Sequence, residues 1–255
     1  MKKIISLALA SVLSVAMLAG CGSEKKEAGS AASDNVLTMA TNAEFPPFEY
    51  LEGEEIVGAD VDMAKAVAEE LGMKLEITNI DFDAALTGAA TRKYDVAIAG
   101  VTATEERKQN MNFSDDYYKA SQAIIVMADS DIKVAADLEG KTVSCQEGTT
   151  GEQYLLDEGY EIQSFKTGAE AISALTAGKV SAVVIDNAVA TALSEKQEGK
   201  TVVLDEALTE EAYAIALQKG NDELTEKING ALKTLKDNGK LAEIFAKYEL
   251  PYDAE

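Results

Sequence analysis

One short segment, Thr102–Arg107 with the sequence TATEER, contains one of only two arginines among the 23 basic residues of the chain. Lysine carries a mobile point charge, whereas the planar guanidinium of arginine grips a carboxylate through two parallel hydrogen bonds. The choice of arginine at position 107 is therefore explained if a carboxylate is held there in a fixed geometry. A surface arginine without a specific partner is the alternative.

The residue types also exclude several kinds of chemistry. The chain contains no histidine, which rules out Ser-His and Cys-His catalytic pairs and any histidine-ligated metal site. Cys145 lies in a strand-like stretch, TVSCQ, and is expected to be a packing residue. A formal net charge of -22 argues against nucleic acid or an anionic membrane surface as the partner. No metal and no cofactor are expected.

Residues 1–20 have the pattern of a secretory signal peptide. Lys2 and Lys3 precede an apolar run that is too short for a comfortable membrane span. The sequence LAGC that ends at Cys21 resembles the lipobox of bacterial lipoproteins, which implies cleavage before Cys21 and lipid chains on that residue. Residues 21–35 are then a flexible tether, since they lack large apolar side chains. The alternative is an uncleaved N-terminal helix with an incidental cysteine.

From Val36 onward, strand patterns alternate with helix patterns. Val61, Ala64 and Ala68 repeat at helical spacing, with Asp60 placed to start the helix and Gly72 to end it. Repeated strand-helix-strand units predict an α/β fold with parallel sheets covered by helices on both faces. Strands are expected at 36–41, 74–78, 94–100, 141–145, 161–165 and 181–186, and further helices at 149–159, 169–177 and 222–245, the last one interrupted at 237–239.

Polar and aromatic residues follow the ends of these strands. Sheets of this kind bind ligands beyond the carboxyl ends of their strands. Aromatic rings, hydroxyls, an arginine and an aspartate gather at equivalent ends, which predicts one binding site there. The segments that follow the strands are NAEFPPFEY, DFD, VTATEER, EGTTG and DNA.

In order and spacing these segments resemble the family 3 extracellular solute-binding proteins, the amino-acid receptors of ABC importers. The resemblance covers essentially the whole chain from Val36 and is carried by NAEFPPFEY, IVGADVDMAKAVAEELG and YDVAIAGVTATEERKQNMNFSDDYY. It implies a two-lobed, periplasmic-binding-protein-like fold of type II in which the lobes close over a ligand. The first lobe is expected at 36–118 and 215–255 and the second at 119–214, with hinge crossings near 118–122 and 210–214.

A free amino acid carries a carboxylate and an ammonium group, and burying either one unpaired is costly. The resemblance assigns the carboxylate to Arg107, helped by the hydroxyl and the amide of Thr102 and by the amide of Thr149. Thr149 and Thr150 begin a predicted helix after Gly148, where free N–H groups favour an anion.

The resemblance assigns the ammonium group to Asp186, helped by the carbonyl of Gly100. An N-cap of the following helix is the alternative role of Asp186, and the two roles are compatible. Phe45 and Phe82 occupy the aromatic positions that flank the ligand side chain, and Ala99 belongs to the same strand end as Gly100. Core packing is the alternative for both phenylalanines.

The identity of the ligand is harder to predict. Basic amino-acid and glutamine receptors of the family commonly have an acid where this chain has Asn42, and glutamine receptors have a lysine where it has Gln146. Both departures replace a charge with an amide, which favours an uncharged polar ligand, although Glu44 could still receive a cation.

The expected protein is therefore a monomeric receptor and not an enzyme. It would be held by lipid to the outer face of the bacterial cytoplasmic membrane, in the periplasm if there is an outer membrane, and would deliver an amino acid to the transmembrane permease. A dehydratase-like enzyme on the same fold is the first alternative, with Glu44 or Glu147 as the acid or base. A ligand-binding sensor is the second.

Overall fold

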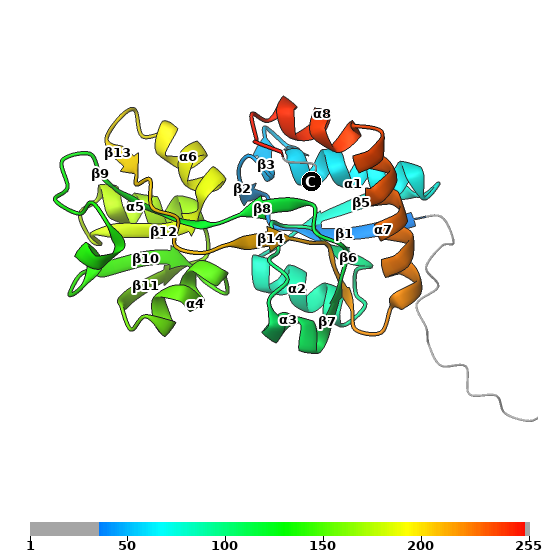
Figure 1. The fold of residues 1–255 in the computed structure, drawn as a ribbon, viewed down its shortest axis with the longest axis horizontal. Helices are drawn as coiled ribbons and strands as arrows, with labels where there is room; N and C mark the ends of the chain where they lie inside the picture. The colour runs from blue at the N-terminus through cyan, green and yellow to red at the C-terminus, as the bar shows by residue number, and fades with distance from the viewer. Residues whose placement is uncertain (1–35, 253–255) are drawn as a thin grey trace, which may run out of the picture. The chain divides into compact units, whose positions relative to one another are not determined.

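A computed structural model describes residues 36–252, which belong to one compact unit. The predicted signal peptide, the tether and Cys21 lie outside the described residues. Two five-stranded sheets dominate the unit, each with helices on both faces (Figure 1). Within residues 36–252 no helix combines the length and the apolar character needed to cross a membrane.

The first sheet is mixed. β1 is parallel to β5 and β6, whereas β15 is antiparallel to β6 and β7. Its apolar side chains alternate between the two faces, so that α1, α7 and α8 cover one face and α2 covers the other. The strand order is β5 (Lys74–Asn79), β1 (Val36–Thr41), β6 (Val96–Ala97), β15 (Ala216–Gln218) and β7 (Met111–Phe113). The helices are α1 (Ala59–Glu70), α2 (Phe82–Ala90), α3 (Glu105–Asn110), α7 (Asp222–Asp237) and α8 (Lys240–Lys247).

The second sheet is built in the same way. β10 is parallel to β11 and β12, and β9 is antiparallel to β12 and β13. Helices α5 and α6 pack on one face and α4 on the other. The strand order is β11 (Glu161–Phe165), β10 (Thr142–Gln146), β12 (Ala182–Asp186), β9 (Gln122–Met127) and β13 (Thr201–Val203). The helices are α4 (Thr150–Asp157), α5 (Gly168–Thr176), α6 (Asn187–Glu195) and the 3-10 turn Ala135–Leu138.

The chain passes between the two sheets twice. β8 (Tyr118–Ala120) leads out of the first sheet and β14 (Glu211–Tyr213) leads back, and the two strands pair antiparallel, side by side in Figure 1. The predicted two-lobed α/β fold with two crossings is confirmed. The expectation of parallel sheets is corrected to mixed sheets. The antiparallel strands β9 and β15 enter their sheets directly from the crossings and not through a helix, which explains their direction.

Two local predictions need correction, and one small sheet was not predicted. The strand expected at 94–100 is reduced to Val96–Ala97. The segment around Phe45 forms a small antiparallel sheet that the sequence patterns did not indicate, with strands β2 (Glu44–Phe45), β3 (Glu49–Glu52) and β4 (Glu55–Val57). Asp60 does not cap α1; Gly58 is the N-cap, and Asp60 is fully buried in the first turn.

Gly58 lets the start of α1 approach the backbone of the Phe48 loop. The amides of Ala59 and Asp60 donate to the carbonyls of Pro47 and Phe48 at 3.0 and 2.9 Å. A Cβ atom on Gly58 would lie 2.1 Å from the Phe48 carbonyl oxygen, and the φ angle of 132° is rarely adopted by other residues.

We therefore expect Gly58→Ala to lower the free energy of unfolding by at least about 2 kcal/mol. Denaturant unfolding measures this effect. Gly53→Ala is the matched control, because Gly53 has a φ of 66° but no other atom within 4 Å of the position that a Cβ would occupy. Equal losses in the two variants would show that the close contact at Gly58 has no cost of its own.

Candidate functional site

A pocket opens where the ends of β1, β6, β10 and β12 meet the first turns of α2 and α4. All the residues predicted for the binding site line it, with the exception of Glu44 and Gly148. The lining residues are Asn42, Phe45, Glu49, Phe82, Ala99, Gly100, Thr102, Arg107, Gln146, Thr149, Thr150 and Asp186. They come from both lobes, so the pocket lies between the two sheets.

The guanidinium of Arg107 reaches from α3 across the pocket. Its Nη1 donates to the carbonyl of Thr102 at 2.9 Å, and its Nη2 donates to the carbonyl of Gly148 in the other lobe at 3.0 Å. The guanidinium also lies over the ring of Phe82, with its Cζ 5.4 Å from the ring centroid. Burial lowers the pKa of Arg107, and the charges of Glu211 and Asp186 counteract this effect. Because a guanidinium has five N–H donors, further donors remain for an anion.

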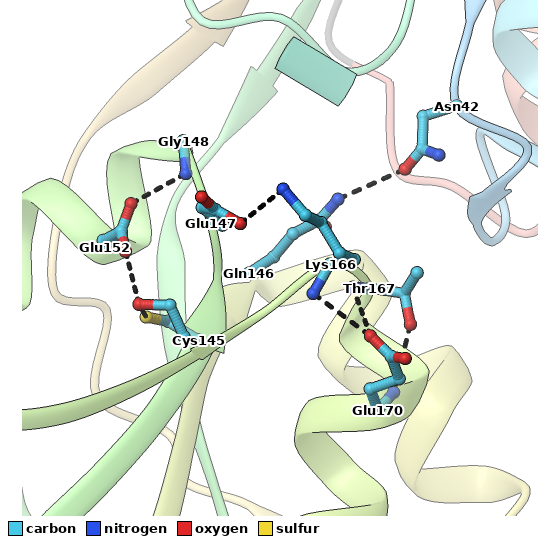
Figure 2. A network of polar contacts seen from close by, with 10 residues as sticks. Asn42, Cys145, Gln146, Glu147, Gly148, Glu152, Lys166, Thr167 and Glu170 are labelled. Carbon is cyan, nitrogen blue, oxygen red and sulfur yellow. Dashed lines mark hydrogen bonds and ion pairs between the residues drawn. The ribbon is translucent and has the colours of Figure 1, made fainter. Parts of the chain in front are cut away.

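Helix α4 presents its first turn to the same pocket. Thr149 is the N-cap, and its hydroxyl accepts from the amide of Glu152 at 3.3 Å. The amide of Gly148, by contrast, donates to the Glu152 carboxylate at 2.7 Å (Figure 2). The helix start predicted at Thr149 is thus present, but the amide of Gly148, directly before it, already donates to a side chain of the helix.

Asp186 ends β12 and is almost completely buried. Its Oδ1 accepts a hydrogen bond from the hydroxyl of Tyr213 at 2.5 Å. Burial, together with the negative charge of Glu211, raises the pKa of Asp186 to about 6. Asp186 occupies the N-cap position of α6 but makes no capping hydrogen bond with its side chain, so its carboxylate is directed elsewhere.

Two phenylalanines form apolar walls of the pocket. Phe45 and Phe82 are 6% and 8% exposed, and both also belong to hydrophobic clusters, so the wall and the core roles coexist. Phe45 packs closely on Gly100, where an added Cβ would lie 2.7 Å from the ring. Gly100 has a φ of 56°, which favours glycine.

The two amides expected to select the ligand side chain contact each other. Nε2 of Gln146 donates to Oδ1 of Asn42 at 3.2 Å (Figure 2). Nδ2 of Asn42 donates to the carbonyl of Ile80. Oε1 of Gln146 is buried and has no hydrogen-bond partner. Because a buried acceptor without a donor is costly, this oxygen is suited to receive an N–H group.

Several predicted residues are placed differently from the rest. Glu44 is exposed in β2 and does not line the pocket, because its side chain points away from the face that Phe45 occupies. Gly148 contributes its carbonyl to Arg107 from just outside the pocket.

Glu147, named for the enzyme alternative, forms an ion pair with Lys166 at 2.6 Å (Figure 2). Cys145 is buried, and burial raises the pKa of its thiol to about 11, so the thiol is protonated at neutral pH.

One pocket residue, Glu49, was not anticipated. It is fully buried, and neither of its carboxyl oxygens has a conventional donor. Burial, followed by the neighbouring charge of Asp60, raises the pKa of Glu49 well above its ordinary value. Asp60 in turn accepts from the amide of Gly100 and the hydroxyl of Tyr117 at 2.9 and 2.8 Å, which fixes the backbone of the pocket at Gly100.

Within residues 36–252 no group of three or more histidine, cysteine, aspartate or glutamate side chains is arranged to hold a metal ion. The pocket thus combines a cationic side chain, Arg107, with an anionic one, Asp186. It also has two aromatic walls and an amide oxygen without a hydrogen-bond partner.

Comparisons with known proteins agree on one protein family. The sequence profile of the bacterial extracellular solute-binding proteins, family 3, matches residues 37–251. The chain is 35% identical to the arginine-binding extracellular protein ArtP of Bacillus subtilis, over 97% of this chain and 98% of that protein. It is 32% identical to the ABC transporter glutamine-binding protein GlnH of the same organism, over 97% of both chains.

Among solved structures, an ancestral arginine-binding protein, determined with glutamine and with arginine, superposes with a TM-score of 0.80 at 42% identity. The match covers 84% of this chain and 97–98% of that one. An ancestral amino-acid-binding protein described as a precursor of cyclohexadienyl dehydratase superposes with a TM-score of 0.78 at 34% identity, over 84% of this chain and 95% of that one.

Proposed function

The chain belongs to the bacterial extracellular solute-binding proteins of family 3, and we propose that it is the receptor of an ABC importer for a free L-amino acid. The observation that carries the proposal is the pairing of Arg107 and Asp186 in one pocket. Asp186 is buried and Arg107 is partly buried, and each can neutralise one charge of a zwitterion.

In this proposal, the carboxylate of the amino acid lies against the guanidinium of Arg107. The remaining N–H groups of Arg107 and the amides of Thr102 and Thr149 surround it with donors. The ammonium group lies against Asp186 and the carbonyl of Gly100. The hydroxyl of Thr102 is already committed, because it donates to Glu211 at 2.6 Å, so in this arrangement it is not a donor to the carboxylate.

We further propose that the ligand is captured by closure of two lobes. The first would comprise residues 36–118 and 215–255 and the second residues 119–214, with β8 and β14 as the hinge. A ligand favours closure only as far as it binds the closed state more tightly than the open one. The closed form would deliver the amino acid to a transmembrane permease, and a lipid on Cys21 would hold a monomeric receptor at the membrane.

For the ligand side chain, we propose a polar, uncharged group with N–H donors. Asn42 and Gln146 supply amides and no charge at this end of the pocket, and the unpaired Oε1 of Gln146 calls for a donor. A glutamine side chain fits these requirements, since its amide both donates and accepts.

Arginine is the second candidate. ArtP and the ancestral protein are named for arginine, and a guanidinium also supplies N–H donors. Two carboxylates, Asp186 and Glu211, act on the single guanidinium of Arg107. This excess of negative charge is compatible with an additional positive charge on the ligand.

Calorimetric titration of the full-length chain with each of the twenty common L-amino acids tests both assignments. We expect at least one amino acid to bind, with glutamine preferred over arginine and lysine. A tenfold preference for arginine or lysine would overturn the uncharged ligand and support the second candidate. Absence of binding to every amino acid would overturn the receptor function.

The enzyme alternative is tested with the same sample. We expect the bound amino acid, released after incubation and identified by mass spectrometry, to be chemically unchanged. The named activities of ArtP and GlnH are binding activities, which supports this expectation. Release of a dehydrated product would instead support a dehydratase-like enzyme.

A further inference from the structure

The carboxylate of Glu211 accepts hydrogen bonds from three threonine hydroxyls. Its Oε2 accepts from Thr102 at 2.6 Å and from Thr150 at 2.8 Å, and its Oε1 accepts from Thr209 at 2.7 Å. Glu211 lies in the crossing strand β14 and does not itself line the pocket, whereas Thr102 and Thr150 do. A charged acceptor makes these hydrogen bonds stronger than bonds between neutral groups.

The two threonines that share Oε2 come from different lobes. Thr102 follows β6 in the first lobe and forms an isolated bridge with Tyr213 of β14. Thr150 is the first residue of α4 in the second lobe, where its hydroxyl also accepts from Nε2 of Gln122 at 3.2 Å. A single oxygen atom of Glu211 therefore connects the two walls of the pocket.

We propose that Glu211 is a positioning residue that couples the two lobes and so assembles the amino-acid site. The inference rests on the proposed function, because the site it assembles is the proposed one. Separating the lobes moves Thr150 away from Thr102, so Glu211 cannot keep both hydrogen bonds in an open form. Each bond that exists only in the closed form favours closure and raises the affinity for a ligand that requires it.

The charge of Glu211 also acts on both ends of the site. It favours the charged form of Arg107, which burial opposes. Burial is the largest cause that raises the pKa of Asp186 to about 6, and the charge of Glu211 is the second. The other titratable groups whose charge or hydrogen bond acts directly on one of these two side chains are Tyr213, Glu49, Asp83 and Glu106. Thus Glu211 differs from a residue that only supports the fold, because its removal changes the titration of the site.

The first test measures amino-acid affinity by calorimetry in the full-length chain. We expect Glu211→Ala to weaken binding by about tenfold to a hundredfold, the range for losing hydrogen bonds to a charged group. Glu211→Gln keeps one oxygen that can accept both hydroxyls, so its loss is expected to be smaller. Glu210→Ala is the matched control: it removes the same functional group from the exposed neighbouring position, and affinity is expected to be unchanged.

The second test asks whether Thr102 and Thr150 communicate through Glu211. The variants are Thr102→Val, Thr150→Val and the double variant, each made in the wild-type and in the Glu211→Ala background. The two losses of affinity should deviate from additivity by about threefold or more in the wild-type background and should be additive in the Glu211→Ala background. The same cycle, measured by denaturant unfolding without ligand, is expected to give the same pattern with a smaller deviation, because only closed molecules make both hydrogen bonds.

The third readout is the pH profile of affinity. Glu211→Gln should move the acid limb of the profile to lower pH, because removal of the negative charge lowers the pKa of Asp186. Glu210→Gln should leave the limb in place.

These measurements separate the two proposals. If the wild-type chain binds no amino acid, the proposed function is wrong, and the unfolding cycle still tests the coupling. If the wild-type chain binds but Thr102 and Thr150 are additive in both backgrounds, or equally coupled in both, the role of Glu211 is overturned while the receptor function stands. An unchanged affinity in Glu211→Ala would also overturn it.

Discussion

Arg107→Lys is expected to weaken amino-acid binding by about 2–5 kcal/mol, which corresponds to roughly thirtyfold or more. The charge is kept, but the planar fork is lost. In the structure, Nη1 and Nη2 each donate to a backbone carbonyl, one in each lobe, and this holds the guanidinium in place. A lysine ammonium has three donors on one nitrogen and cannot satisfy both carbonyls while also presenting two parallel N–H groups to a carboxylate.

Calorimetric titration with the amino acid that binds the wild-type chain measures the loss. Arg92→Lys is the matched control, because it makes the same substitution at an exposed residue beyond the end of α2. We expect its affinity to equal that of the wild-type chain. If Arg107→Lys also retained full affinity, Arg107 would not bind the carboxylate, and its role would be limited to its hydrogen bonds with the carbonyls of Thr102 and Gly148.

Local sequence patterns predicted the parallel strands of both sheets and five of the helices, but not the antiparallel strands β9 and β15 or the helices α2 and α3. Together with the family resemblance, they predicted most of the pocket lining. The spacing of Val61, Ala64 and Ala68 gave the buried face of α1, because each of these positions lies on one side of a helix. The binding segments could be predicted because parallel strands bring their carboxyl ends to one edge. Residues that follow β1, β6, β10 and β12 accordingly meet in one pocket, although long stretches of sequence separate them.

What the sequence did not predict depends on contacts between distant segments. Asp60 has the position and chemistry of a helix cap, yet its carboxylate is buried beside Glu49 and accepts from Gly100 and Tyr117. Nothing local distinguishes such a residue from a cap in the first turn of a helix. Glu49, the first residue of the short strand β3, has the local sequence of an ordinary exposed acid. Only the packing of the Phe45 loop on α1 brings the two acids together.

The ligand prediction shows a second kind of limit. Asn42 and Gln146 were considered separately, as two places where a charge is replaced by an amide. In the structure they are hydrogen-bonded to each other across the lobes, so only one of their groups, Oε1 of Gln146, remains without a partner. The number of unused donors and acceptors, which decides what a ligand must supply, follows from the contact and not from the residue types.

Asp186→Asn is expected to weaken amino-acid binding by about 2–5 kcal/mol and at the same time to stabilise the ligand-free protein. An asparagine keeps the acceptor for the Tyr213 hydroxyl but cannot neutralise an ammonium group. Burying the ionised Asp186 is unfavourable, since its pKa rises from an ordinary value of 3.8 to about 6 mainly through burial. At pH 8 the neutral side chain should therefore raise the free energy of unfolding, by up to about 3 kcal/mol.

The pH dependence follows with a definite sign. Because the pKa of Asp186 is higher in the folded state, its cost to stability is absent below pH 4, grows between pH 4 and 6, and is complete above pH 6. Ligand affinity should change in the opposite direction. In the wild-type chain it should fall as the pH drops below 6, since a protonated Asp186 no longer pairs with the ammonium group, and Asp186→Asn should lose this contribution to the profile. Opposite signs for affinity and stability distinguish a binding carboxylate from a structural one: if Asp186→Asn lowered both, Asp186 would be holding the fold together and the ammonium group would have to be bound elsewhere.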